Sequence, residues 1–270
     1  MTTSAALDLV KQCRTIDAFV GPDAQGNPAG VLVLDEPLAD RAMRDVARRM
    51  GHAETAFLVP RSPGEYDLRW FTPAAEVRLC GHATLASAWT LWNELRVQEN
   101  PLVFHTLSGR LLARRVGTKV ELDFPQDTAR PWIPTRELLR ALCVEKFVYA
   151  GRSPTTHKML IELGDAETVR QVTPDFFAMK EALPNSIGGV IVTARGFGAY
   201  DFVSRYFHPW VGVDEDPATG SAHCLLPTHW SNVLGKDQFH AFQASARGGV
   251  LDVALTGTGR VLLRGHARAP

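Results

Sequence analysis

The sequence has few cysteines and no long apolar segment, and both absences narrow the class of protein. Its four cysteines are far apart and include no CxxC pair, so neither a disulfide framework nor paired zinc ligands are expected. They are Cys13, Cys80, Cys143 and Cys224. The apolar runs are far shorter than the roughly 20 residues that cross a bilayer. We therefore expect reduced thiols and no contact with a membrane.

The chain also lacks an excess of charge of either sign. Its 29 basic and 29 acidic side chains balance, so it carries no field that would attract phosphates, and no nucleic-acid partner is expected. Residues 1–14 have no basic start, continuous apolar stretch or cleavage site of a signal peptide. We expect a cytoplasmic location, with residues 1–14 as a leader that is helical or frayed.

Common cofactor and catalytic motifs are missing as well. There is no GxxxxGK[ST], strand-linked GxGxxG, HExxH or GxSxG motif. His223 and His229 are six residues apart, which places them on different faces of a helix. The sequence thus predicts no cofactor and no metal.

Short β-rich runs, separated by glycine and proline, make up most of the chain, and a few helical patterns interrupt them. Residues 40–50 have the 3.6-residue period of a surface helix. Residues 82–95 and 219–234 are apolar or small on every side, which is typical of buried helices. Helices are also expected at 135–143, with Thr135 as N-cap, and at 166–183, broken at Thr173-Pro174. Pro227 predicts a kink in the second buried helix.

The two halves repeat one pattern. Phe71-Thr72-Pro73 and Phe207-His208-Pro209 each end a strand, a short acidic loop follows, and a buried helix opens. We therefore expect an α/β (α+β) protein of two pseudo-symmetric domains, each a curled, mostly antiparallel sheet around a central apolar helix. The helix openings would then face one cleft.

Both helix openings contain a glycine, Gly81 and Gly220, which lets a ligand approach the backbone. Unpaired N–H groups at a helix start bind a carboxylate without a basic side chain, so a small carboxylate is the expected ligand. The alternative is that both glycines only serve tight turns.

Four side chains are candidates for acid/base chemistry. His82 lies in a first helical turn, where the dipole lowers its pKa and leaves a neutral ring able to relay protons. Glu54 shares a strand face with Ala56 and Leu58, where burial would raise its pKa towards neutrality. Asp216 and Ser221 flank the second opening and could hold substrate groups. A capping role for the last two and for His82, and an exposed edge position for Glu54, remain alternatives.

These motifs together resemble one family. GNPAGV (26–31), ETAF (54–57), FTPAAEVRLCGHATLA (71–86) and EDPATGSAH (215–223) are similar to signatures of the phenazine-biosynthesis PhzF-like isomerases, within the diaminopimelate epimerase superfamily. The resemblance implies two α/β domains, here 15–117 plus 258–270 and 118–257, with the active site between them. It also implies a cofactor-free proton shift, as in trans-2,3-dihydro-3-hydroxyanthranilate isomerase. We further expect a homodimer.

Site residues follow from matching positions in those motifs. Glu54 would be the acid/base group, and His82, Asp216 and Ser221 would assist it. Gly81, Thr219, Gly220 and Asn27 would bind the substrate.

Two alternative functions stay open. The related racemases use a cysteine at each helix opening; Cys80 fits the first, but Cys224 lies more than a turn beyond the second. A two-thiol racemase is therefore disfavoured, and Cys80 alone is more typical of a small buried hydrophobe. A non-catalytic ligand-binding or scaffold protein of the same fold is the other alternative.

Overall fold

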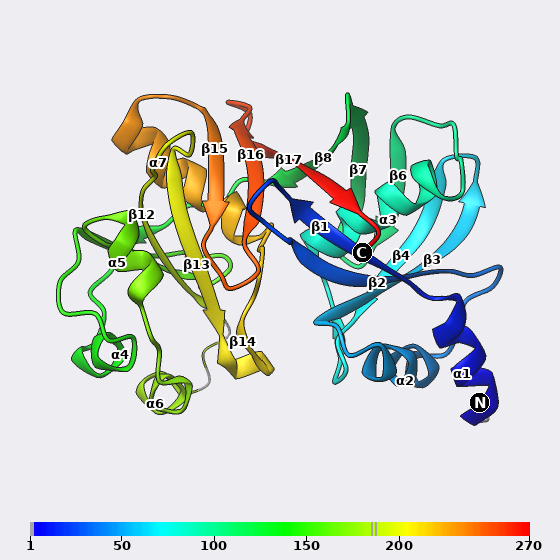
Figure 1. Cartoon of the computed structure of the whole chain (residues 1–270), viewed down its shortest axis with the longest axis horizontal. Helices are drawn as coiled ribbons and strands as arrows, with labels where there is room; N and C mark the ends of the chain where they lie inside the picture. The colour runs from blue at the N-terminus through cyan, green and yellow to red at the C-terminus, as the bar shows by residue number, and fades with distance from the viewer. Residues whose placement is uncertain (1–2, 185, 187) are drawn as a thin grey trace. The chain divides into compact units, whose positions relative to one another are not determined.

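The computed structural model describes residues 3–184, 186 and 188–270. The chain forms two compact units (Figure 1). The first comprises Met1–Asp123 and Arg264–Pro270, and the second comprises Phe124–Leu263. None of the helices described is both long and apolar enough to cross a membrane.

Within its described residues, the first unit contains three helices and several long strands. Its helices are α1 (Thr3–Gln12), α2 (Asp40–Met50) and α3 (Gly81–Asn93). Its strands are β1 (Arg14–Val20), β2 (Asn27–Val33), β3 (Glu54–Ser62), β4 (Glu65–Phe71), β5 (Glu76–Val77), β6 (Leu102–Thr106), β7 (Gly109–Val116) and β8 (Lys119–Pro125). The last residues of β17 (Arg260–Arg268) complete it.

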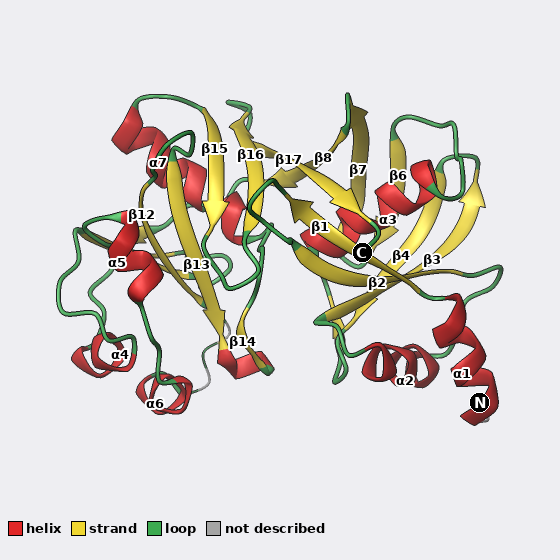
Figure 2. Cartoon of the chain, viewed as in Figure 1, coloured by secondary structure: helices red, strands yellow, loops and turns green. Residues whose placement is uncertain are grey.

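The strands of this unit curl around α3 (Figure 2). β2 and β3 are parallel, as are β4 and β6, whereas the pairs β1–β2, β3–β4, β6–β7 and β7–β8 are antiparallel. β17 pairs with both β1 and β8, which closes the sheet on itself. Closure removes the unpaired edges that an open sheet would expose.

Helix α3 is buried on almost every side, as its apolar sequence predicts. Its hydroxyl side chains would be costly there without partners, but each donates to the carbonyl one turn earlier. Thr84 donates to the Cys80 carbonyl, Ser87 to Ala83 at 2.7 Å and Thr90 to Ala86 at 2.9 Å. The helix thus satisfies its own buried hydroxyl groups.

Helix α2 covers the outer face of the same sheet. Met43 and Val46 pack with Leu32, Phe57 and Phe71 from β2, β3 and β4. Because neighbouring residues of a strand point to opposite faces, Phe57 on the α2 side puts Glu54, Ala56 and Leu58 on the α3 side. This alternation directs the Glu54 side chain towards α3.

The part of the second unit that the structure describes contains four α-helices and two short 3₁₀ helices. Its helices are α4 (Arg136–Ala141), α5 (Ala166–Gln171), α6 (Phe176–Ala182), η1 (Pro209–Val211), η2 (Ala222–Cys224) and α7 (Leu226–Leu234). Its strands are β9 (Arg130–Pro131), β10 (Tyr149–Arg152), β11 (Met159–Glu162), β12 (Val190–Arg195), β13 (Phe202–His208), β14 (Val213–Glu215), β15 (Gln238–Gln243), β16 (Gly249–Leu255) and the start of β17.

Strand order in the second unit repeats that of the first. β10–β11 is antiparallel, β11–β12 parallel, β12–β13 antiparallel, β13–β15 parallel and β15–β16 antiparallel. The same sequence of pairings links β1, β2, β3, β4, β6 and β7. The pseudo-symmetric fold expected from the sequence repeat is therefore confirmed.

Three short helices take the place of α2 in the second unit. α4, α5 and α6 contribute Leu138, Val169 and Met179 to a core shared with Val192 and Phe207 of the sheet. Thr135 caps α4 by accepting from the Leu138 N–H, as predicted. The predicted break at Thr173-Pro174 separates α5 from α6.

The second central helix differs from its prediction in two ways. No continuous helix begins at Thr219: residues 220–221 form a turn, η2 follows, and α7 starts only at Leu226. Pro227 therefore lies in the first turn of α7, where its missing N–H costs no helical bond, and the break replaces the expected kink. Burial all round is also wrong for the end of α7, because Asn232 is exposed.

Candidate functional site

Glu54 and His82 meet inside the first unit. Glu54 is the first residue of β3, and His82 is the second residue of α3. The His82 Nε2 atom lies 3.4 Å from Glu54 Oε2, and the two side chains are 4% and 18% exposed. The strand alternation and the start of the central helix thus bring together the two residues that the sequence singled out for acid/base work.

Burial keeps His82 uncharged. Desolvation lowers its pKa to about 3, and the charge on nearby His52 adds to the effect. His52 itself is hydrogen-bonded to Thr15 Oγ1 at 2.9 Å. Near neutral pH the His82 ring therefore carries one proton, so one ring nitrogen donates and the other accepts.

Cys80 is the third member of this cluster. Its Sγ lies 3.5 Å from His82 Nδ1. One donor atom from each of Glu54, Cys80 and His82 can be chosen so that all lie within 4.8 Å of one another. Yet the thiol contacts one ring nitrogen and the carboxylate contacts the other. An ion binds a single ring nitrogen, so it could not use both of these contacts.

The other expected residues of this unit lie at the starts of α3 and β2. Gly81 is the first residue of α3, between Cys80 and His82, and is buried. Asn27 is fully buried and pairs with Ala18 where β2 begins. Both positions agree with a site around the start of α3, and their contact with a substrate stays a prediction.

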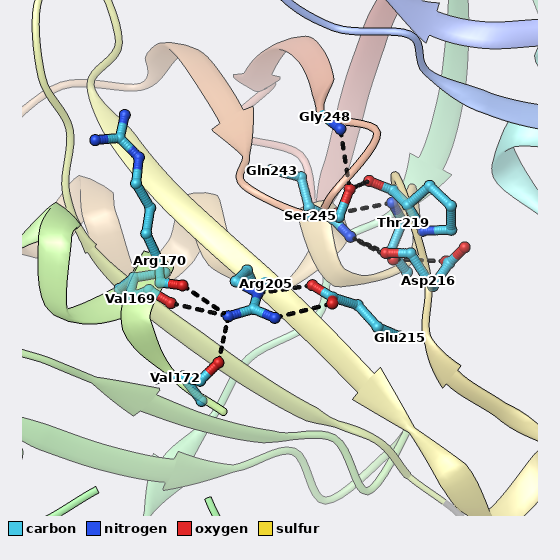
Figure 3. Close-up of polar contacts among 11 residues, drawn as sticks. Val169, Arg170, Val172, Arg205, Glu215, Asp216, Thr219, Gln243, Ser245 and Gly248 are labelled. Carbon is cyan, nitrogen blue, oxygen red and sulfur yellow. Dashed lines mark hydrogen bonds and ion pairs between the residues drawn. The ribbon is translucent and has the colours of Figure 1, made fainter. Parts of the chain in front are cut away.

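Asp216 lies in the second unit, in a loop closed by its own neighbours (Figure 3). Its Oδ2 accepts a hydrogen bond of 2.6 Å from Thr219 Oγ1. Gln243 from β15 accepts from the Thr219 N–H at 2.8 Å and donates to the Asp216 carbonyl at 2.6 Å. Ser245 Oγ donates to the Pro217 carbonyl at 2.8 Å. The loop that carries Asp216 is thus held in one conformation from both ends.

Arg205 fixes the position of Glu215, the residue before Asp216. Arg205 on β13 makes two parallel hydrogen bonds with Glu215, at 2.7 and 2.9 Å, and donates to the carbonyls of Val169, Arg170 and Val172 at the end of α5 (Figure 3). The first unit repeats the pair at the equivalent place. There Arg69 on β4 makes two hydrogen bonds with Glu76, at 2.7 and 2.6 Å.

Residues 219–221 do not form the helix opening that the sequence predicted. Thr219 already uses its N–H and its hydroxyl within the loop. Gly220 and Ser221 lie in a turn before η2, whose three residues are too short to sum to a helix dipole. A carboxylate pocket built from a helix N-terminus is therefore supported at Gly81 but not at Gly220. The half-buried Ser221 side chain remains a candidate ligand group.

Sequence reasoning missed two residues that organise these sites. Gln243 is fully buried and braces the Asp216 loop. A lone amide in the apolar strand FHAFQA was the only signal for it. His52, two residues before Glu54, acts on the His82 charge state. It resembled an ordinary loop histidine in the sequence.

Cys224 has no environment suited to acid/base chemistry. Its thiol is buried and donates to the Gly220 carbonyl at 3.5 Å. Burial raises its pKa to about 12, so it carries no thiolate near neutral pH. The structure therefore gives no support to a second catalytic thiol in the second unit.

Known proteins share both the sequence and the fold of this chain. Residues 16–269 match the profile of the family PhzC-PhzF, "Phenazine biosynthesis-like protein". An uncharacterized isomerase of Halalkalibacterium halodurans is 43% identical over 93% of each chain. A PhzF-family crystal structure from Enterococcus faecalis superposes with a TM-score of 0.86, at 39% identity over 95% of both chains.

More distant structures share the fold alone. A probable proline racemase from Agrobacterium radiobacter superposes with a TM-score of 0.63 at 11% identity, covering 96% of this chain and 90% of that one. This agrees with the epimerase-like fold expected from the sequence. The family profile covers nearly the whole chain, and the relatives match it over nearly their whole length. The chain therefore belongs to the phenazine biosynthesis-like PhzC-PhzF family.

Proposed function

We propose that this protein is an isomerase that moves a proton between two carbons of a small carboxylate, with Glu54 as the acid/base group. The observation that carries the proposal is the buried contact between Glu54 and an uncharged His82. Relatives of similar length are named isomerases, which supports the reaction class. The proton shift of trans-2,3-dihydro-3-hydroxyanthranilate isomerase is the type of reaction we propose.

In the first step, the Glu54 carboxylate takes a proton from the substrate carbon. The electron pair of the broken C–H bond moves into the conjugated system of the substrate. The protonated Glu54 then delivers the same proton to the second carbon, which restores the carboxylate and needs no other acid. A single group that does both must have a pKa near the working pH.

His82 would hold Glu54 in place through both steps. A neutral ring can donate from Nε2 to the carboxylate, and the oxygen it contacts can still accept that bond after Glu54 is protonated. An imidazolium would instead stabilise the carboxylate and lower the pKa of Glu54, so that Glu54 would take the substrate proton poorly. The low pKa of His82 therefore suits a shuttle.

We further propose that Asp216 and Ser221 bind polar groups of the substrate. Asp216 would hold an amine or hydroxyl, and Ser221 would bind the carboxylate end. The braced loop around Thr219 and Gln243 supports this assignment, because a fixed carboxylate loses less entropy on binding. Gly81 and Asn27 are also proposed as substrate contacts.

Glu54→Gln is the experiment that tests the reaction. Glutamine keeps the size and hydrogen bonding of the side chain but cannot exchange a proton. We expect turnover to disappear while ligand binding, measured by calorimetry, stays within a few-fold. Solvent deuterium should enter the product of the native enzyme when Glu54 exchanges its proton before delivery. Turnover near the native rate in Glu54→Gln would refute Glu54 catalysis.

Activity measurements on variants also separate the two alternative functions. A non-catalytic binding protein would bind carboxylates with no turnover in any variant. A two-thiol racemase would lose all activity in Cys224→Ala, whereas the proposed isomerase keeps it. The high pKa of the Cys224 thiol favours the isomerase.

A further inference from the structure

Cys80, His82 and Glu54 form a chain in which the imidazole ring lies between a thiol and a carboxylate. Sγ of Cys80 lies 3.5 Å from Nδ1, a length suited to a hydrogen bond with sulfur. On the far side of the ring, Nε2 lies 3.4 Å from Glu54 Oε2. Cys80 and His82 are 6% and 4% exposed, so water competes little for either contact.

A neutral ring in this position can exist in two tautomers. With the proton on Nε2, Nδ1 accepts from the Cys80 S–H, and the Nε2–H lies 3.4 Å from the Glu54 carboxylate, near it but outside hydrogen-bond geometry. With the proton on Nδ1, the lone pair of Nε2 faces the lone pairs of the carboxylate, and the only donation is to sulfur, a weak acceptor. The first tautomer accepts from the thiol and places an N–H beside the carboxylate, whereas the second makes only a weak hydrogen bond to sulfur.

The two contacts therefore support each other through the ring. A hydrogen bond at one ring nitrogen decides which tautomer the other nitrogen presents. The negative charge of the Glu54 carboxylate, 3.4 Å from Nε2, also favours a proton on that nitrogen. Cys80 adds to this preference by donating to Nδ1 and by filling the space that a water or an acceptor would otherwise occupy.

We propose that Cys80 is a positioning residue that holds His82 in the Nε2–H tautomer, and so presents an N–H group to Glu54. Cys80 acts through His82 and has no contact with the substrate in this role. Its sequence neighbours alone indicated only a small buried hydrophobe. The titratable groups around the ring are Glu54, Cys80 and His52, and His52 is held by Thr15.

This inference rests on the proposed function only for its effect on catalysis. The tautomer itself is a property of the free protein and can be measured without a substrate. Nitrogen-15 NMR of ring-labelled histidine distinguishes Nε2–H from Nδ1–H by the shifts of the two nitrogens. Infrared difference spectra report the S–H stretch of Cys80, which falls in frequency when the thiol donates a hydrogen bond.

Two variants of Cys80 and one control variant form the test. In the native protein we expect Nε2–H to exceed Nδ1–H by at least about tenfold, since the thiol donates to Nδ1 and the nearby carboxylate charge favours a proton on Nε2. Cys80→Ala should reduce that excess about fivefold, the equivalent of one lost neutral hydrogen bond. Cys80→Ser should restore it, because its hydroxyl also donates to Nδ1. Cys143→Ser, which changes an exposed thiol, is the matched control and should leave the tautomer unchanged.

The Glu54→Gln background makes the contribution of Cys80 easier to see. Without the carboxylate, the tautomer depends more on the thiol, so Cys80→Ala should change the populations further in this background. The native-minus-Cys80→Ser infrared spectrum should show an S–H band at lowered frequency. Predominant Nδ1–H in the native protein, an unshifted S–H band, or equal tautomer populations in Cys80→Ala and the native protein would each overturn the proposal.

Kinetics distinguish failure of this inference from failure of the proposed function. Cys80→Ala should lower kcat by no more than about tenfold, since it weakens one bond, with KM nearly unchanged, and Cys80→Ser should recover it. If Glu54→Gln still turns over while the tautomer behaves as expected, the proposed reaction is wrong and the positioning role stands. If Glu54→Gln is inactive while Cys80→Ala leaves the tautomer unaltered, the reaction stands and the positioning role is wrong.

Discussion

Arg205 and Glu215 are joined by two parallel hydrogen bonds, and Glu215 is the direct neighbour of Asp216. The same guanidinium closes the end of α5 by donating to three carbonyls. The planar guanidinium makes both bonds to Glu215 with Nε and Nη2, while the two N–H groups of Nη1 are shared among the three carbonyls; an ammonium group could not do this. Arg69 and Glu76 repeat the pair in the first unit. In each unit, the arginine on the long strand therefore holds the loop that leads to the central helix.

Removing the arginine should destabilise the second unit. Arg205→Met leaves Glu215 half-buried without its cation and frees three carbonyls, so we expect a loss of about 3 kcal/mol in the free energy of unfolding. Urea denaturation measures it. Arg48→Met is the control, because the Arg48–Asp45 pair is 61% and 39% exposed and should contribute less than about 1 kcal/mol. Equal losses in both variants would contradict the role given to Arg205.

The catalytic prediction has a matched control within the first unit. Glu65 also contacts a histidine, with 3.1 Å between Oε2 and His105 Nε2, but that pair is 39% and 32% exposed. Glu54→Gln should lower kcat by at least about 10²-fold, because acid/base groups contribute 10²- to 10⁴-fold. Glu65→Gln should leave kcat within a factor of two. A similar loss in both would indicate a structural effect rather than proton transfer.

Buried histidines should make the protein sensitive to acid. Desolvation lowers the pKa of His82 to about 3 and the pKa values of His208 and His223 to about 4, all below the ordinary value near 6.5. Between the lowered pKa values and 6.5, the histidines of the unfolded chain bind more protons than those of the folded protein. The free energy of unfolding therefore falls as the pH falls from 6.5 towards 4. Each histidine contributes about 1.4 kcal/mol per pH unit in this window.

Urea denaturation at several pH values checks this slope. His223→Phe should reduce it, because the variant removes one of the three groups and keeps the ring contact with Phe202. A free energy of unfolding that stays constant between pH 4.5 and 6.5 would contradict the burial of these neutral rings.

Gln243 should contribute to ligand binding, because it holds the loop that carries Asp216. Gln243→Leu removes the bonds to the Thr219 N–H and to the Asp216 carbonyl. Leaving these buried groups unpaired should cost about 1–3 kcal/mol of stability. Carboxylate binding should weaken about tenfold, an estimate from the ordering that the loop would have to regain. Gln171→Leu, at an exposed site on α5, is the control. Unchanged binding in Gln243→Leu would show that the loop does not hold the ligand.

Particular residues show how far sequence reasoning reached. The apolar sequence of residues 82–95 predicted a central helix, because no face could meet water, and α3 is that helix. The second helix was placed too early, because residues 219–221 look equally suited to a helix and a turn. Their hydrogen bonds to Asp216 and Gln243 decide for the turn. Gln243 is 24 residues from Thr219, so no local pattern could reveal the contact.

The sequence by itself determined the strands, the repeat and the residue types at the candidate site, since these depend on period, composition and local turn chemistry. Only the tertiary structure decided which face of β3 is inward. A two-residue period marks two faces without saying which is buried, and α2 packing on Phe57 settles it by directing Glu54 towards α3. Tertiary structure also decided that Cys80 and Glu54 lie on opposite sides of the same ring, because that contact joins a strand to a helix start 26 residues later.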